Sequence, residues 1–304
     1  EAPEFLRLAA DTAIAKDFRV KAATLAAMVA DNSYEPQAVN DAYSAVQSIC
    51  EDDDDSADCF LCSLVFHTAV GDPSKVRALA LRYADHARRS TDKRLHIHGL
   101  RRAGNALLRV GLHADAQRLL AESLEAAEKL RLSAQAFATS DVLLTCYLLN
   151  GQLSLAEIEL ARSRELLTRS GTEAMRIMLR YSSIMFAWLT NDNQLATRLA
   201  DETTSHLQHS LAATRYCATI GEIALKLMIA PSTICREDLQ SCEELFRRGG
   251  GLGRQDLNTT ILCRALSSTG DVATAESIAR EYRARRRELT PGPFSFPTTV
   301  AGAS

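Results

Sequence analysis

Cys59 and Cys62 are separated by two residues, a spacing that pairs of thiolate ligands have in structural zinc sites. Such a site needs four ligands, and neither a second closely spaced cysteine pair nor a His-x3-His pattern follows at a suitable distance. The eight cysteines also lack the close, regular spacing of a disulfide framework. We therefore expect no metal site, reduced thiols, and a helix in which this pair behaves as two small buried apolar residues.

Other patterns associated with catalysis are weak. The glycine-rich segment 249–253 follows a predicted helix rather than a strand and lacks the Lys-Ser or Lys-Thr of a phosphate-binding P-loop, so we expect a loop between helices. His96 and His98 are two residues apart, so on a helix they point in different directions. The sequence contains no Gly-x-Ser-x-Gly or His-Glu-x-x-His motif. We therefore predict a non-enzymatic protein with no catalytic residue, metal or cofactor.

Two sets of acidic and amide residues support an alternative. Asp54, Asp55 and Asp58 form Asp-Asp-x-x-Asp. A second set recurs in four-residue steps at Asn193, Thr197 and Asp201. Both sets resemble the magnesium motifs of class I terpene synthases, which implies an all-helical enzyme that holds magnesium ions against a diphosphate leaving group. The second set ends in Asp where the family has Glu, and both sets lie on predicted turns, so this enzyme is the less favoured alternative.

The composition excludes several classes of protein. A formal net charge of -3 over 304 residues gives no basic footprint for nucleic acid, which is bound through clustered Lys and Arg. The most apolar stretch, 220–230, contains Glu222 and Lys226 and is too short to cross a membrane. No secretory signal opens the sequence. We therefore expect an intracellular, cytoplasmic protein that binds neither membranes nor nucleic acid directly.

Turn-forming residues recur about every 40 residues along the chain. They are Asp31-Asn32, Gly71, Gly111, Gly151, Asn191, Pro231 and Gly270. Each follows an apolar helical stretch, and at four of them an alanine stands five residues later, namely Ala116, Ala156, Ala196 and Ala275. This period predicts an all-α array with one helical hairpin per repeat.

Seven hairpins account for most of the chain. Their predicted helix pairs are 11–30 with 35–50, 57–70 with 73–89, 93–110 with 114–130, 133–149 with 153–169, 173–190 with 194–209, 212–229 with 236–247, and 255–268 with 272–288. Residues 1–10 are interpreted as an N-terminal lead, 11–289 as the repeat domain, and 290–304 as a flexible tail or linker. Gly71, Gly151 and Gly270 are expected to adopt the left-handed conformation that ends a helix.

The third hairpin carries the clearest family resemblance. Gly104, Leu107, Gly111, Ala116 and Leu120 follow the spacing of large and small residues in a tetratricopeptide repeat, which this segment resembles. The fourth hairpin keeps Tyr147, Gly151, Ala156 and Leu160, and the last keeps Leu266, Gly270 and Ala275. The resemblance covers about residues 11–288, with repeats of about 40 residues where the family usually has 34. Such lengthened repeats look similar to those in bacterial LuxR-type activators, in diguanylate cyclases and in scaffold subunits such as those of the anaphase-promoting complex.

The resemblance implies a right-handed superhelix whose concave groove is lined by the first helix of each hairpin. A polar part of this groove is predicted at His98, Arg101, Asn105, Arg109, Asp141 and Thr145. Guanidinium and amide donors suit a peptide carboxylate. The pair Arg101 and Asn105 resembles part of the carboxylate clamp with which some family members bind chaperone tails. The clamp is incomplete, because Val142, Met178 and Ser182 stand where it needs further polar or basic groups.

An apolar part of the groove is predicted in the fifth hairpin. Tyr181, Met185 and Trp188 recur at helical spacing and would grip a peptide helix or strand if they face the groove. We therefore predict a scaffold or regulatory module that docks a protein or peptide, with self-association through the terminal hairpins as a further possibility. The alternative within regulation is a small-molecule sensor coupled to an output domain beyond Pro291.

Overall fold

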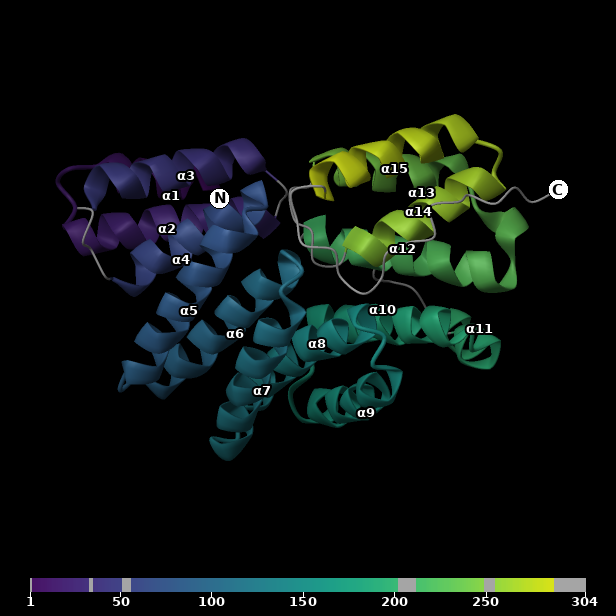
Figure 1. Ribbon diagram of the computed structural model, residues 1–304, viewed down its shortest axis with the longest axis horizontal. Helices are drawn as coiled ribbons and strands as arrows, with labels where there is room; N and C mark the ends of the chain where they lie inside the picture. The colour runs from purple at the N-terminus through teal and green to yellow at the C-terminus, as the bar shows by residue number, and fades with distance from the viewer. Residues whose placement is uncertain (1, 33–34, 51–55, 202–211, 249–254, 287–304) are drawn as a thin grey trace.

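The computed structural model describes residues 2–32, 35–50, 56–201, 212–248 and 255–286. These residues form fifteen α-helices, one short 3-10 helix and no β-strand (Figure 1). The first eight helices are α1 (Ala2–Ala10), α2 (Lys16–Asn32), α3 (Pro36–Ile49), α4 (Ala57–Val70), α5 (Pro73–Arg89), α6 (Lys93–Arg109), α7 (His113–Lys129) and α8 (Ser133–Leu149). The others are α9 (Leu153–Ser170), α10 (Glu173–Thr190), α11 (Asn193–Ala200), α12 (Ala212–Ile229), α13 (Arg236–Arg248), α14 (Gln255–Ser268) and α15 (Val272–Arg286), with the 3-10 helix at Pro231–Thr233. The all-α prediction is confirmed.

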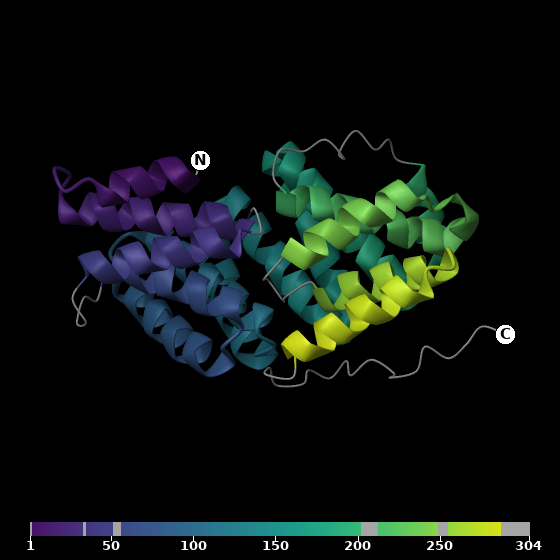
Figure 2. The same ribbon diagram turned by 90° about the horizontal axis from the view of Figure 1, so that it is seen from above.

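Helices that follow one another in the chain also pack against one another. The pairs α2–α3, α4–α5, α6–α7 and α8–α9 are in contact, as are α10–α11, α12–α13 and α14–α15. Figure 1 shows the helices before α7 on one side and those after α11 on the other, with α8 near the middle and α10 beside α12, and Figure 2 shows the N-terminal and C-terminal helices on opposite sides from above. The first helices of successive pairs also touch, because α6 contacts both α4 and α8, and α10 contacts α8 and α12.

The predicted turn residues adopt the backbone conformation that their types favour. Gly71, Gly111, Gly151 and Gly270 have φ between 67° and 86°, and Asn191 has φ 54°. A left-handed residue is costly for most side chains but not for glycine, and it lets the chain reverse after a helix. An aspartate follows three of these turns and caps the next helix, as when the Asp192 carboxylate accepts the Leu195 backbone N–H at 2.9 Å. The forty-residue period thus corresponds to a repeated helix stop followed by a helix start.

The N-terminal region differs from the sequence prediction. Residues 1–10 are interpreted as a lead segment, but Ala2–Ala10 form α1, which packs on α2. The next helix begins at Lys16 rather than at residue 11, because a turn precedes it in which the Asp11 carboxylate accepts the Ala13 backbone N–H at 2.9 Å. Residues 202–209 of the predicted helix 194–209 lie outside the described residues, as does the predicted tail 290–304.

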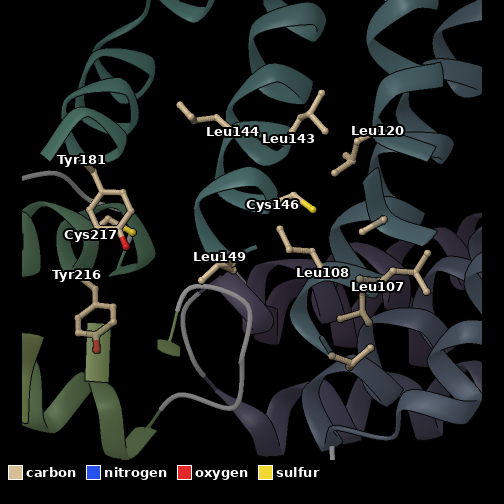
Figure 3. Packing of buried hydrophobic residues seen from close by; sticks show 14 of the residues in the cluster. Leu107, Leu108, Leu120, Leu143, Leu144, Cys146, Leu149, Tyr181, Tyr216 and Cys217 are labelled. Atoms are coloured by element: carbon tan, nitrogen blue, oxygen red, sulfur yellow. The ribbon is translucent and has the colours of Figure 1, made fainter. Parts of the chain in front are cut away.

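A continuous apolar core runs through the helix pairs. Figure 3 shows part of it, where Leu107 and Leu108 of α6 lie near Leu120 of α7 and Cys146 of α8. The alanines that follow the turns are buried, and Ala116, Ala156 and Ala196 are fully inaccessible, which allows close helix contact. None of the helices in the described ranges is both long and apolar enough to cross a membrane.

The cysteines are arranged differently from the prediction of reduced thiols throughout. The structure pairs Cys50, directly after α3, with Cys59, in the first turn of α4. The pairing is possible because α3 and α4 pack together, which places the two residues near each other. Cys62 is fully buried, as predicted, and burial raises the pKa of its thiol to about 12.

Candidate functional site: a basic cluster on helix α6

One face of α6 concentrates polar side chains. These are His98, Arg101, Arg102, Asn105 and Arg109, and all five are partly exposed. At 3.6 residues per turn, their positions fall within an arc of about 100° around the helix. The opposite side of α6 is buried through Ile97, Leu100, Ala103 and Leu107. Four of the five polar residues are those predicted from the sequence, and Arg102 is an addition.

Two glycines fix α6 closely against its neighbours. A Cβ atom on Gly99 would lie 2.5 Å from the Cβ of Ala87 in α5. A Cβ atom on Gly104 would lie 2.7 Å from the Cγ of Leu120 in α7. Both distances are too short for real carbon atoms, so only glycine permits this packing. The contacts on two sides set the rotation of α6 and thereby the direction of its polar face.

Arg109 is already bound to another part of the chain. Its Nη1 and Nη2 donate to the two carboxylate oxygens of Asp31, at the end of α2, over 2.6 Å and 2.8 Å. A bidentate pair of this kind is among the stronger polar contacts in proteins. Both side chains are largely shielded, with exposures of 17% and 16%. Arg109, which the sequence predicts as a groove residue, therefore ties α6 to α2.

Arg101 and Arg102 differ from Arg109 in their bonding. Neither guanidinium has a hydrogen-bond or ion-pair partner among the described residues, and the Nε of Arg102 is buried without one. Burial lowers the pKa of Arg101 to about 10, and the positive charge of Arg102 contributes to the lowering. Burial also lowers the pKa of Arg102. The two side chains thus hold two positive charges close together without a bound acid.

The charges of the two arginines act on His98 and Tyr83. Burial, together with the charges of Arg101 and Arg102, lowers the pKa of His98 to about 4, so its imidazole is neutral at pH 7. Burial raises the pKa of Tyr83, in α5, to about 12, so its hydroxyl keeps its proton. We call His98, Arg101 and Arg102 the α6 basic cluster. Its charge and donors suit an anionic group.

The two predicted groove residues on α8 are buried. Asp141 is 8% exposed, and its Oδ1 accepts a hydrogen bond from the Ser182 hydroxyl of α10 at 3.0 Å. The Thr145 hydroxyl donates to the Asp141 carbonyl at 2.9 Å within α8. Asp141 acts on Arg101 through its negative charge, which opposes the lowering of the arginine pKa. These two residues are therefore buried in the packing of α8 rather than part of an open surface.

The apolar groove surface predicted in the fifth hairpin is mostly core. Tyr181 and Met185 are 3% and 1% exposed, and the Tyr181 hydroxyl donates to Asn258 of α14 at 2.6 Å. They are covered because α12 packs on α10 and α14 approaches the same region. Trp188 is partly exposed, with the Arg264 guanidinium carbon 5.4 Å from its ring centroid. The expected gripping surface is therefore corrected to a buried contact between helices.

The residues of the alternative magnesium motifs lie on separate elements of the fold. Asp58 is in the first turn of α4, and its carbonyl accepts the Thr24 hydroxyl at 3.0 Å, whereas Asp54 and Asp55 lie outside the described residues. Asn193 and Thr197 belong to α11, where the Thr197 hydroxyl donates to the Asn193 carbonyl, and Asp201 follows that helix. Within the described ranges, no three His, Cys, Asp or Glu residues are grouped so that they could hold a metal ion.

Comparison with known proteins gives no family. No protein-family model matches this chain, and no curated protein sequence matches it. The assignment of a role therefore depends on the geometry of the α6 basic cluster and its surroundings.

Proposed function

We propose that this protein is a non-catalytic docking module that binds an acidic segment of a protein or peptide partner at the α6 basic cluster. The observation that carries the proposal is that Arg101 and Arg102 stand together on a partly exposed face without an acid bound to them among the described residues. Two guanidinium groups present several N–H donors in fixed directions, which suits carboxylate or phosphoryl groups.

The proposed architecture is a tetratricopeptide-like array of seven hairpins with a concave groove lined by their first helices. It is supported by the packed helix pairs and by the left-handed turn residues at a spacing of about 40. It is also supported by contacts of α6 with α4 and α8, which are the first helices of the flanking pairs. In this proposal the protein acts inside the cell, in scaffolding or regulation.

A capture experiment tests the docking proposal. The full chain would be immobilised and exposed to lysate, and bound proteins would be identified by mass spectrometry and then tested as purified proteins. Arg101→Gln/Arg102→Gln removes the two charges of the cluster, while Arg164→Gln/Arg198→Gln removes two charges from exposed positions on α9 and α11. A partner that binds directly to wild type and to the control, but not to the first variant, would support docking at α6. Equal binding to all three would overturn it.

A second candidate function is a sensor for a small anionic molecule. It is favoured by the same two guanidinium groups, which have no bonded partner in the described part of the chain and need no extended peptide to be neutralised. Calorimetric titration with small carboxylates and phosphates separates this candidate from docking. Binding of a small anion with no protein partner would favour the sensor.

A further inference from the structure

We propose that the α6 basic cluster binds a phosphoryl group with two negative charges, carried by the docked partner as a phosphorylated side chain. The identity of the carrier rests on the proposed docking function. The phosphoryl site itself does not, because inorganic phosphate can probe it directly.

The charge of the cluster is the first reason. Arg101 and Arg102 together carry two positive charges, and His98 adds none because its imidazole is neutral at pH 7. A single carboxylate would leave one of these charges uncompensated in a largely buried place. A phosphorylated side chain carries a charge of about -1.5 to -2 at pH 7 and so matches both.

The neighbouring acids of the chain are the second reason. The Asp31 carboxylate is held by Arg109 through two short hydrogen bonds, and Asp141 accepts from Ser182. Elsewhere in the structure an arginine does have a bonded acid. The Arg88 guanidinium donates to the two carboxylate oxygens of Glu122 over 2.6 Å and 2.8 Å. The described acids near Arg101 and Arg102 thus influence them only through their charge, without bonding to them.

The available donors are the third reason. A phosphoryl group has three terminal oxygens and can accept bonds from two guanidinium groups that approach from different directions, whereas a carboxylate has two oxygens in one plane. Arg101 and Arg102 are adjacent in α6, so their side chains leave the helix about 100° apart. The charge of Asp141 acts on Arg101, and that of Asp31 acts on Arg102. The charges of both arginines act on the Tyr83 hydroxyl, and because burial raises its pKa to about 12 it keeps its proton at pH 7.

The test is a calorimetric titration of the full chain at pH 7.5 and fixed salt. The ligands are inorganic phosphate, a short phosphoserine peptide, and the same peptide with Ser or Glu in place of phosphoserine. We expect the phosphoserine peptide to bind about tenfold or more tightly than either comparison peptide, and Arg101→Gln/Arg102→Gln to weaken that binding by about tenfold or more. Arg164→Gln/Arg198→Gln should leave it within about twofold.

Two further measurements keep the result interpretable. Urea unfolding shows whether each variant is folded. Arg102→Lys keeps the positive charge but loses the planar arrangement of donors, so it should weaken binding measurably, though less than the double variant does. If phosphate and the phosphoserine peptide fail to bind wild type while the Glu peptide binds, the phosphoryl site is overturned and docking stands. If phosphate binds but no peptide does, the phosphoryl site stands and docking fails.

Discussion

Helices α6 and α10 both carry arginines in largely buried surroundings. They differ in whether the positive charge of these arginines is compensated by a bonded acid. On α10, Arg180 is 9% exposed, and its guanidinium donates to Glu222 of α12 at 2.9 Å and also to the Leu199 carbonyl. On α6, Arg101 and Arg102 have no such partner among the described residues.

The difference distinguishes a structural role for Arg180 from the binding role proposed for Arg101 and Arg102. Removing a charge from water is costly unless other groups compensate it, so a paired buried arginine is part of the fold. An unpaired one reduces stability, and in the proposed function the docked partner supplies the compensating charge. The α10 site therefore predicts large stability effects, and the α6 site predicts binding effects with small changes in stability.

The largest effect is expected from breaking the α10 pair. Arg180→Met should lower the free energy of unfolding by about 3 kcal/mol, because it leaves the Glu222 carboxylate without its partner. Urea unfolding followed by circular dichroism measures this. The double variant Arg180→Met/Glu222→Met should recover part of the loss. A cost below about 1 kcal/mol for the single variant would mean that the pair is not structural.

The position of α6 can be disturbed without touching its charges. Gly99→Ala should cost about 2 kcal/mol, because the new methyl group would meet the Cβ of Ala87. It should also weaken phosphate binding, since α6 must move away from α5. Gly99→Ala/Ala87→Gly removes the clash and should restore binding. If Gly99→Ala binds phosphate as wild type does, the fixed orientation of α6 is not needed for the site.

Glu159 is a buried acid, and it allows the effect of burial on a negative charge to be compared with its effect on the arginines. Glu159 is 3% exposed, and burial raises its pKa above the ordinary 4.5 although the Ser140 hydroxyl bonds to it at 2.5 Å. A raised folded-state pKa contributes stability below pH 4.5 that is lost as the pH rises through the folded-state value. The stability of wild type relative to Glu159→Gln, measured by urea unfolding across pH, should therefore be greatest below pH 4.5 and fall with increasing pH. A difference that rises with pH instead would contradict this.

The smallest change in stability is expected at the α6 basic cluster. Arg102→Met should alter the free energy of unfolding by less than about 1 kcal/mol, in the direction of a gain, because it removes a buried charge that has no bonded partner among the described residues. The same urea measurement used for Arg180→Met makes the two sites directly comparable. A loss as large as that of Arg180→Met would show that Arg102 is part of the fold.

The turns and helices could be predicted because their causes are local. Gly111 and Asn191 tolerate the left-handed conformation, and their spacing marks the helix ends. The helix Ala2–Ala10 could not, because a short helix has little stability of its own and α1 depends on packing against α2. The presence of this helix therefore becomes visible only in the folded structure.

The site could be predicted only in part, for a similar reason. Helical spacing places Arg101 and Asn105 on one face, and the same spacing could have included Arg102, which lies four residues after His98. The partner of Arg109 is 78 residues away, so no local pattern reveals it. The assignment of Tyr181 and Met185 to a surface is wrong because spacing does not show which face another helix will cover.

The bond between Arg109 and Asp31 also bears on how the protein unfolds. In an array of helix pairs where each pair contacts only the next, one end can melt while the remainder persists. This ion pair joins the first predicted hairpin to the third and passes over the second. Unfolding that begins at the N-terminal end must therefore break the bond to Arg109 in α6. We expect the first three hairpins to exchange their amide hydrogens as one cooperative block.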